Sequence, residues 1–116
     1  MLKVYGIKNC SSMKKAFDLL NELDLAYEFH DYKKQGIDAD TVKVWLNDIG
    51  ADIVLNKKGT TWRKLSIEEQ QKALDSEEGL IAALTTHNSL IKRPVISAES
   101  DYVVGFNEDA IRALKK

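Results

Sequence analysis

The chain has 116 residues, a length that predicts one domain with a core of its own and no need for disulfides or structural metals. It carries 17 lysine and arginine residues against 18 aspartate and glutamate residues, and this balance argues against a general binder of nucleic acids or membrane surfaces. A single cysteine excludes an intramolecular disulfide framework and fits a reducing compartment.

The beginning of the chain runs from Met1 directly into an apolar stretch, without the pattern of a signal peptide. No apolar run approaches the length of a membrane span. We therefore expect a cytoplasmic protein that acts as a monomer, with no membrane contact and no direct contact with nucleic acid.

The first third of the chain predicts a strand, a helix and a second strand. Residues 2–5 form a short, mostly apolar run, and Gly6 ends it. Residues 9–12 offer polar capping groups before helical spacing begins at residues 13–23, and the aromatic, alternating stretch 25–32 is typical of a strand. A unit of this size is expected to form a right-handed parallel crossover.

The rest of the chain predicts further helices and a hairpin. In chain order, we expect a polar turn at 33–36, a helix from Asp38 to Ile49 stopped by Gly50, a basic polar loop at 56–64, a helix opened by a Ser66–Glu69 capping box, a helix from about Ser76 to His87, a hairpin of residues 95–97 and 102–104, and a last helix capped by Asn107. This order predicts an α/β domain with a four-stranded mixed sheet.

Cys10 is expected where the first helix begins. Backbone N–H groups at a helix N-terminus, together with Lys8, Lys14 and Lys15, favour a thiolate and a lowered thiol pKa. Two interpretations stay open from the residues, a reactive thiol and a small buried hydrophobe. Thioredoxin-type pairs place a second cysteine where Met13 stands, so Cys10 needs an external thiol to resolve any disulfide.

Arg93 and Pro94 form the second informative pair. From the residues alone, a trans proline that opens a strand and an arginine paired at the surface are the simpler interpretation, and Arg63 has the same ambiguity. No second cysteine and no close cluster of ligating side chains gives the spacing of a metal site. His30 and His87 are therefore assigned neither as metal ligands nor as bases for the cysteine.

Several stretches in order resemble the arsenate reductase/Spx (ArsC-like) family, and most of all its YffB-type branch of small thiol reductases. They are Tyr5-Gly-Ile-Lys-Asn-Cys10, Phe29-His-Asp-Tyr32, Leu55-Asn56, Gly59-Thr-Thr-Trp-Arg-Lys-Leu65, Ile91-Lys-Arg-Pro94 and Gly105-Phe106. The resemblance implies a thioredoxin-like fold over residues 1–116, with helices on both faces of the sheet and a helical insertion at about 38–88.

The resemblance also implies roles for individual residues. Cys10 matches the nucleophilic thiolate, and Arg93 matches an arginine that stabilises the thiolate and a bound anion. Pro94 matches a cis-proline beside the active-site loop, where the backbone would hold an extended thiol such as glutathione. The residues expected to contact glutathione or the substrate are Lys8, Asn9, Ser11, Ser12, Arg63 and Pro94.

Two departures from the family narrow the expected activity. Glutaredoxin-coupled arsenate reductases use three arginines around the cysteine, but Phe106 falls where the last would align, and the insertion offers Asn56 or Lys58. Phe106 cannot bind an oxyanion, which argues against efficient arsenate reduction. Many Spx-type regulators carry a Cys-x-x-Cys switch, which Met13 removes.

The sequence therefore predicts a thiol-dependent oxidoreductase with one nucleophilic cysteine and no bound cofactor. Glutathione is the expected co-substrate, glutaredoxin or thioredoxin the expected protein partner, and a disulfide or small oxyanion the expected substrate. One alternative is a Spx-like transcriptional regulator that binds RNA polymerase. Another is a family member whose thiol is inert.

Overall fold

The computed structural model describes residues 1–99 and 101–114. The chain divides into two compact units, which are described separately. The first comprises Met1–Gln35 and the chain from Arg93 onwards, and the second is Gly36–Lys92. The second unit includes the stretch, about 38–88, that was expected to form a helical insertion. A single domain over the whole chain stays a prediction.

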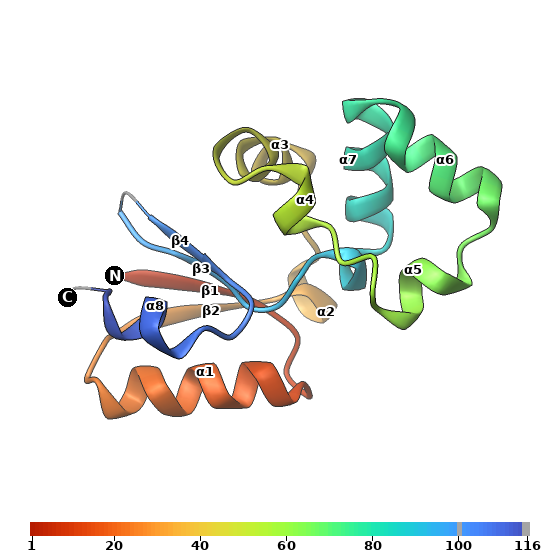
Figure 1. The fold of residues 1–116 in the computed structure, drawn as a ribbon. Coiled ribbons are helices and arrows are strands. Elements are labelled where there is room, and N and C mark those ends of the chain that lie inside the picture. The colour runs from red at the N-terminus through yellow and green to blue at the C-terminus, as the bar shows by residue number, and fades with distance from the viewer. Residues whose placement is uncertain (100, 115–116) are drawn as a thin grey trace. The chain divides into compact units, whose positions relative to one another are not determined.

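A four-stranded sheet forms the centre of the first unit (Figure 1). Its strands are β1 (Leu2–Gly6), β2 (Tyr27–Asp31), β3 (Val95–Ser97) and β4 (Tyr102–Val104), in the spatial order β2-β1-β3-β4. Strands β1 and β2 are parallel, whereas β3 pairs antiparallel with both β1 and β4. The predicted mixed sheet is confirmed.

Helices α1 (Ser11–Glu22) and α8 (Glu108–Arg112) lie on the same face of this sheet (Figure 1). The buried side chains of α1 recur at helical spacing, so one stripe of the helix faces the sheet. The core of the unit consists of Leu2, Val4, Met13, Ala16, Leu19, Leu20, Leu25, Ile96, Val103 and Ile111. With the crossover, the hairpin and the closing helix, this is the predicted thioredoxin-like α/β fold. The short helix α2 (Tyr32–Gln35) follows β2 directly.

The second unit is helical throughout its named elements. They are α3 (Ala39–Asp48), α4 (Ala51–Val54), α5 (Thr60–Lys64), α6 (Ile67–Asp75), α7 (Glu77–Thr86) and the 3₁₀ turn η1 (Asn88–Leu90). Short-range caps start three of them: the Asp38 carboxylate accepts from Thr41 N–H, Ser66 and Glu69 form the predicted capping box, and Ser76 Oγ accepts from Gly79 N–H. None of the helices in the described residues is long and apolar enough to cross a membrane.

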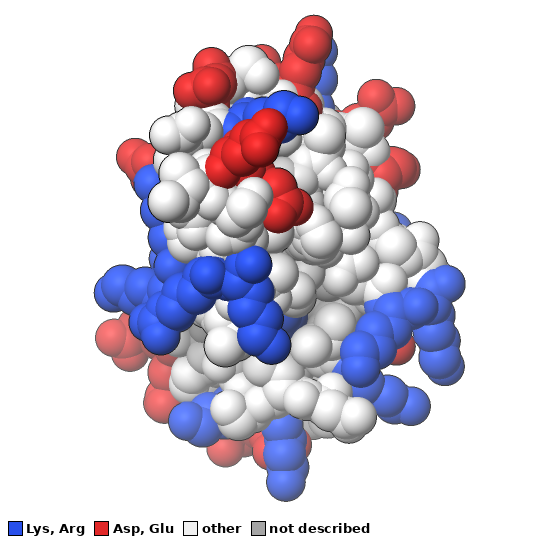
Figure 2. Space-filling view, turned by 90° about the vertical axis from the view of Figure 1, so that its right-hand side faces the viewer, with Lys and Arg blue, Asp and Glu red and all other residues white. Residues whose placement is uncertain are grey.

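Two segments differ from the expected elements. The loop expected at 56–64 contains α5, because Trp62 is buried and its carbonyl accepts a hydrogen bond of 2.8 Å from the Gln70 side chain. The polar turn expected at 33–36 is largely helix α2. In both segments a polar composition predicted a loop or turn, but a short helix forms in which one aromatic side chain, Trp62 or Tyr32, is buried. Figure 2 shows basic and acidic side chains together on the face that it draws, so charge of one sign does not cover it.

Candidate active site

Cys10 lies at the N-terminal end of α1, as expected. It is the N-cap residue, with an extended backbone (φ −134°, ψ 132°), and its carbonyl accepts the first helical hydrogen bond from Lys14 N–H at 3.0 Å. Gly6 ends β1, and residues 7–9 carry the chain from the sheet to this position. Its position at the N-terminus places the sulfur at the positive end of the helix dipole. Because the side chain is only half-buried, the sulfur remains accessible to a substrate.

The environment lowers the pKa of the Cys10 thiol. Burial raises this pKa, but the backbone N–H groups of Met13 and Ser12 and the guanidinium of Arg93 together outweigh the effect of burial. The thiol side chain makes no capping hydrogen bond. The backbone N–H groups and Arg93 lower its pKa because they stabilise the negatively charged thiolate. A larger thiolate fraction at neutral pH makes Cys10 a better nucleophile than an ordinary cysteine.

The pairing of the strands explains how Arg93 reaches the sulfur. Tyr5 pairs with Val95 in the antiparallel β1–β3 ladder, so the loop after β1 and the segment before β3 meet at one end of the sheet. Arg93 is half-buried, and its guanidinium favours the anionic form of Cys10. The structure therefore brings together the two residues predicted as catalytic.

Tyr32 lies at this end of the sheet too, because β1 and β2 run parallel and Gly6 pairs with Asp31. Its side chain is 2 % exposed. Burial raises its pKa and Tyr5 raises it further, whereas Arg93 opposes them, so the phenol is neutral at physiological pH. Tyr32 Oη and Arg93 Nη1 are buried without a hydrogen-bond partner among the described residues. Sequence reasoning did not single out Tyr32.

The peptide bond between Arg93 and Pro94 is cis. This agrees with the family resemblance and differs from the trans bond expected from the residues alone. Pro94 is buried, and its carbonyl accepts a hydrogen bond of 2.8 Å from Gly105 N–H. Gly105 has a φ of +77°, a conformation that favours glycine. A role of Pro94 in holding a thiol stays a prediction.

A cleft of about 520 Å³ opens beside the sulfur. Residues 8–11 line one part of it, which includes the predicted contact residues Lys8, Asn9 and Ser11. Phe17, Tyr27 and Phe29 line another part. Sequence reasoning missed these rings as site residues. Their signal was present, because Phe17 follows Cys10 by two helical turns and the other two alternate along one face of β2.

The remaining predicted site residues differ in where the structure places them. Ser12 contributes its backbone N–H to the sulfur. Arg63 is exposed on α5, within the second unit, and a role at the thiol stays a prediction for it. Phe106 packs against the core of the first unit, with the Lys15 ammonium 5.9 Å from its ring centroid. It serves as a packing residue at the position where the family resemblance led us to expect an arginine.

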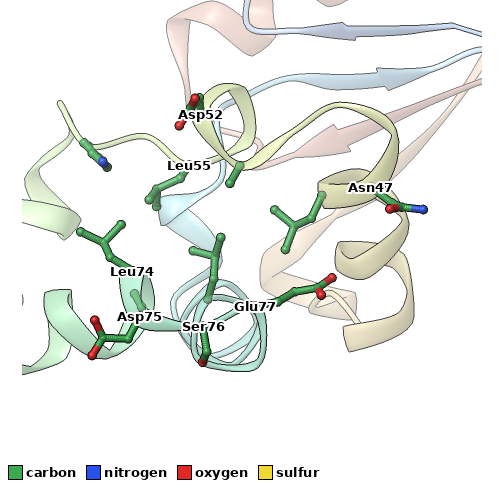
Figure 3. A pocket seen from close by; sticks show the side chains of 12 residues that line it. Asn47, Asp52, Leu55, Leu74, Asp75, Ser76 and Glu77 are labelled. Carbon is green, nitrogen blue, oxygen red and sulfur yellow. The ribbon is translucent and has the colours of Figure 1, made fainter.

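A separate hollow of about 610 Å³ lies within the second unit (Figure 3). Leu55 and Leu74 line it together with the acidic side chains Asp52, Asp75 and Glu77. It contains no nucleophilic thiol and none of the predicted site residues. In the part of the chain that the structure describes, no three His, Cys, Asp or Glu side chains gather in a way that would hold a metal ion.

Comparison with known proteins identifies the family. Residues 5–114 match the model of the ArsC family. The chain belongs to the ArsC family. This match spans segments of both units and includes Cys10 and Arg93.

Solved ArsC-like structures share the fold over nearly the whole chain. A protein named YffB is 42 % identical, with a TM-score of 0.90 over 97 % of both chains. An arsenate reductase (ArsC) related protein from Brucella melitensis is 36 % identical, with a TM-score of 0.74 over 97 % of this chain and 92 % of its own. The global transcriptional regulator Spx of Listeria innocua is 27 % identical over 97 % of this chain and 85 % of its own length.

Proposed function

We propose that this ArsC-family chain is a thiol-dependent reductase that uses Cys10 as its nucleophile and glutathione as the resolving thiol. The observation that carries the proposal is the position of Cys10, a half-buried N-cap cysteine whose pKa is lowered by two backbone N–H groups and by Arg93. Burial without these groups would give a less acidic and less reactive thiol. An inert, structural cysteine has no need of them.

The proposed reaction is a pair of thiol–disulfide exchanges. The Cys10 thiolate attacks the glutathione sulfur of a mixed disulfide, forms a Cys10–glutathione disulfide, and releases the substrate as a thiolate that takes up a proton. A second glutathione thiolate then attacks the glutathione sulfur bound to Cys10, which releases oxidised glutathione and restores the Cys10 thiolate. Overall, the mixed disulfide and one free glutathione give the reduced substrate thiol and oxidised glutathione, so one S–S bond is broken and one is formed.

Each named residue has a part in these steps. Arg93 and the N–H groups of Ser12 and Met13 stabilise the sulfur when it is an anion, both before attack and when it leaves. The absence of cysteine at position 13 means that no neighbouring thiol competes with glutathione. Phe106 in place of an arginine favours a disulfide substrate over arsenate, because it offers no charge to an oxyanion.

The pH dependence of Cys10 alkylation by iodoacetamide, with and without millimolar glutathione disulfide, tests the proposal. We expect a rate midpoint below the ordinary thiol pKa, and a Cys10–glutathione disulfide detected by mass spectrometry that reduced glutathione removes. Multiple turnovers with a glutathione mixed disulfide should disappear in Cys10→Ser. An ordinary midpoint with no glutathione adduct would refute the reductase and support an inert thiol.

The Spx relatives favour a second candidate, a regulator that binds RNA polymerase. The two candidates make opposite predictions for Cys10→Ser. A regulator without the Cys-x-x-Cys switch should bind purified polymerase equally well with serine at this position, whereas the reductase should lose all turnover. A pull-down with purified RNA polymerase, performed on wild type and Cys10→Ser, separates them.

A further inference from the structure

The cleft beside Cys10 has an aromatic wall built by α1 and β2. The ring of Phe17 stacks on that of Tyr27 at a centroid distance of 5.4 Å, and meets Phe29 edge-on at 5.0 Å. All three side chains are half-buried: they pack against the core of the first unit and also line the cleft. Ring faces and edges arranged in this way bind a further aromatic group well.

Positively charged side chains outnumber negatively charged ones in the lining of the cleft. Lys8 and Lys14 are exposed at its lining and are opposed by the single carboxylate of Asp18. Lys14 follows Cys10 by four residues on α1, and Phe17 follows by seven, so one face of the helix presents sulfur, ammonium and ring in succession. This order fits a ligand that has a carboxylate close to its sulfur and an aromatic ring.

We propose that the cleft binds the non-glutathione half of the substrate disulfide, and that this half is an aromatic thiol bearing a carboxylate. The inference rests on the proposed function and specifies its substrate class. Phe17, Tyr27 and Phe29 hold the ring, and Lys14 pairs with the carboxylate. The glutathione half lies outside this aromatic wall.

The same cleft should recognise a symmetric aryl disulfide in one exchange step. The Cys10 thiolate attacks one sulfur of dithiobis(nitrobenzoate), the S–S bond breaks, one nitrobenzoate thiolate leaves, and the other remains bound to Cys10 as a mixed disulfide. The aryl disulfide is the oxidant in this step: the electron pair of the broken S–S bond departs with the released thiolate, and the Cys10 sulfur is oxidised to the mixed disulfide. The released thiolate is coloured, which gives a direct rate.

The test compares second-order rate constants for three disulfides under excess reagent. Dithiobis(nitrobenzoate) has a ring and a carboxylate, dithiodipyridine has a ring without a carboxylate, and bis(hydroxyethyl) disulfide has neither. In Phe17→Leu, we expect both aryl disulfides to react about 2- to 10-fold more slowly, with bis(hydroxyethyl) disulfide changed by less than about twofold. Leucine keeps the packing against the core, and thermal unfolding checks the fold.

The charge is tested with Lys14→Gln against Lys34→Gln, an exposed lysine on α2 that does not line the cleft. Lys14→Gln should slow dithiobis(nitrobenzoate) by about 2- to 5-fold at low salt and leave dithiodipyridine nearly unchanged. Lys34→Gln should change neither. Because each variant is normalised to bis(hydroxyethyl) disulfide, a general change in thiol reactivity cancels.

Two results would overturn the inference in different ways. If every disulfide slows equally in Phe17→Leu, or none does, the aromatic wall does not bind the substrate, while the reductase proposal stands. If wild-type Cys10 reacts with all three no faster than free glutathione at the same pH, the proposed function fails as well.

Discussion

Gly6 and Met13 form a contact on which the active-site loop depends. Gly6 is the last residue of β1, and a methyl group added to it would overlap the sulfur and terminal methyl of the Met13 side chain. Met13 is fully buried, so its side chain has little room to withdraw. The backbone N–H of Met13 also helps to lower the pKa of the Cys10 thiol. Gly6→Ala should therefore disturb both stability and reactivity.

The size of the effect follows from overpacking a closed core. Forcing an extra methyl group into such a site costs about 1–3 kcal/mol of the free energy of unfolding. For a chain of this size, about 4 °C of melting temperature is lost per kcal/mol, so we expect a drop of about 4–12 °C. A displaced Met13 N–H should also raise the pKa of the thiol and move the alkylation midpoint to higher pH.

A double-mutant cycle measured by urea unfolding tests this reasoning. Met13→Ala removes the atoms that the new methyl group meets, at a cost of about 2–5 kcal/mol for the lost packing. In that background, Gly6→Ala should cost about 0.5 kcal/mol or less, because the space is open. An equal cost of Gly6→Ala in both backgrounds would refute the steric explanation and point to backbone conformation instead.

Three other predictions concern the thiol and the helical unit. Arg93→Gln should raise the pKa of Cys10, seen as a higher alkylation midpoint, whereas Arg112→Gln, which removes the same charge at exposed ion pairs, should leave it unchanged. The pKa of Cys10 is lower in the folded than in the unfolded state, so its thiolate stabilises the fold at high pH. The free energy of unfolding of wild type relative to Cys10→Ser should therefore rise as pH increases from the folded pKa to the ordinary thiol pKa, and fall again as pH decreases. Urea unfolding at several pH values measures this difference. Gly79→Ala should destabilise the chain by about 2 kcal/mol or more in the same assay, because its methyl group would overlap the Lys72 carbonyl; an unchanged midpoint would contradict this close approach.

Local features of the site were predictable from the sequence. Cys10 as the N-cap of α1, the Ser66–Glu69 box and the Asn107 cap all depend on hydrogen bonds within one turn, between residues three or four apart. The alternating stretch of β2 is local in the same sense. These local patterns determine where helices and strands begin. They therefore also place the Cys10 thiol beside the free backbone N–H groups at the N-terminus of α1.

Only the tertiary structure brings Arg93 and the aromatic wall to the thiol. The antiparallel pairing of β1 with β3 brings Arg93 to Cys10 from the far end of the chain, and the packing of α1 against β2 gathers Phe17 with Tyr27 and Phe29. From residue spacing alone they are a surface arginine and ordinary core positions, and only the family resemblance indicated a role for Arg93. Their roles arise from strand register and packing between distant segments, which local propensity does not encode.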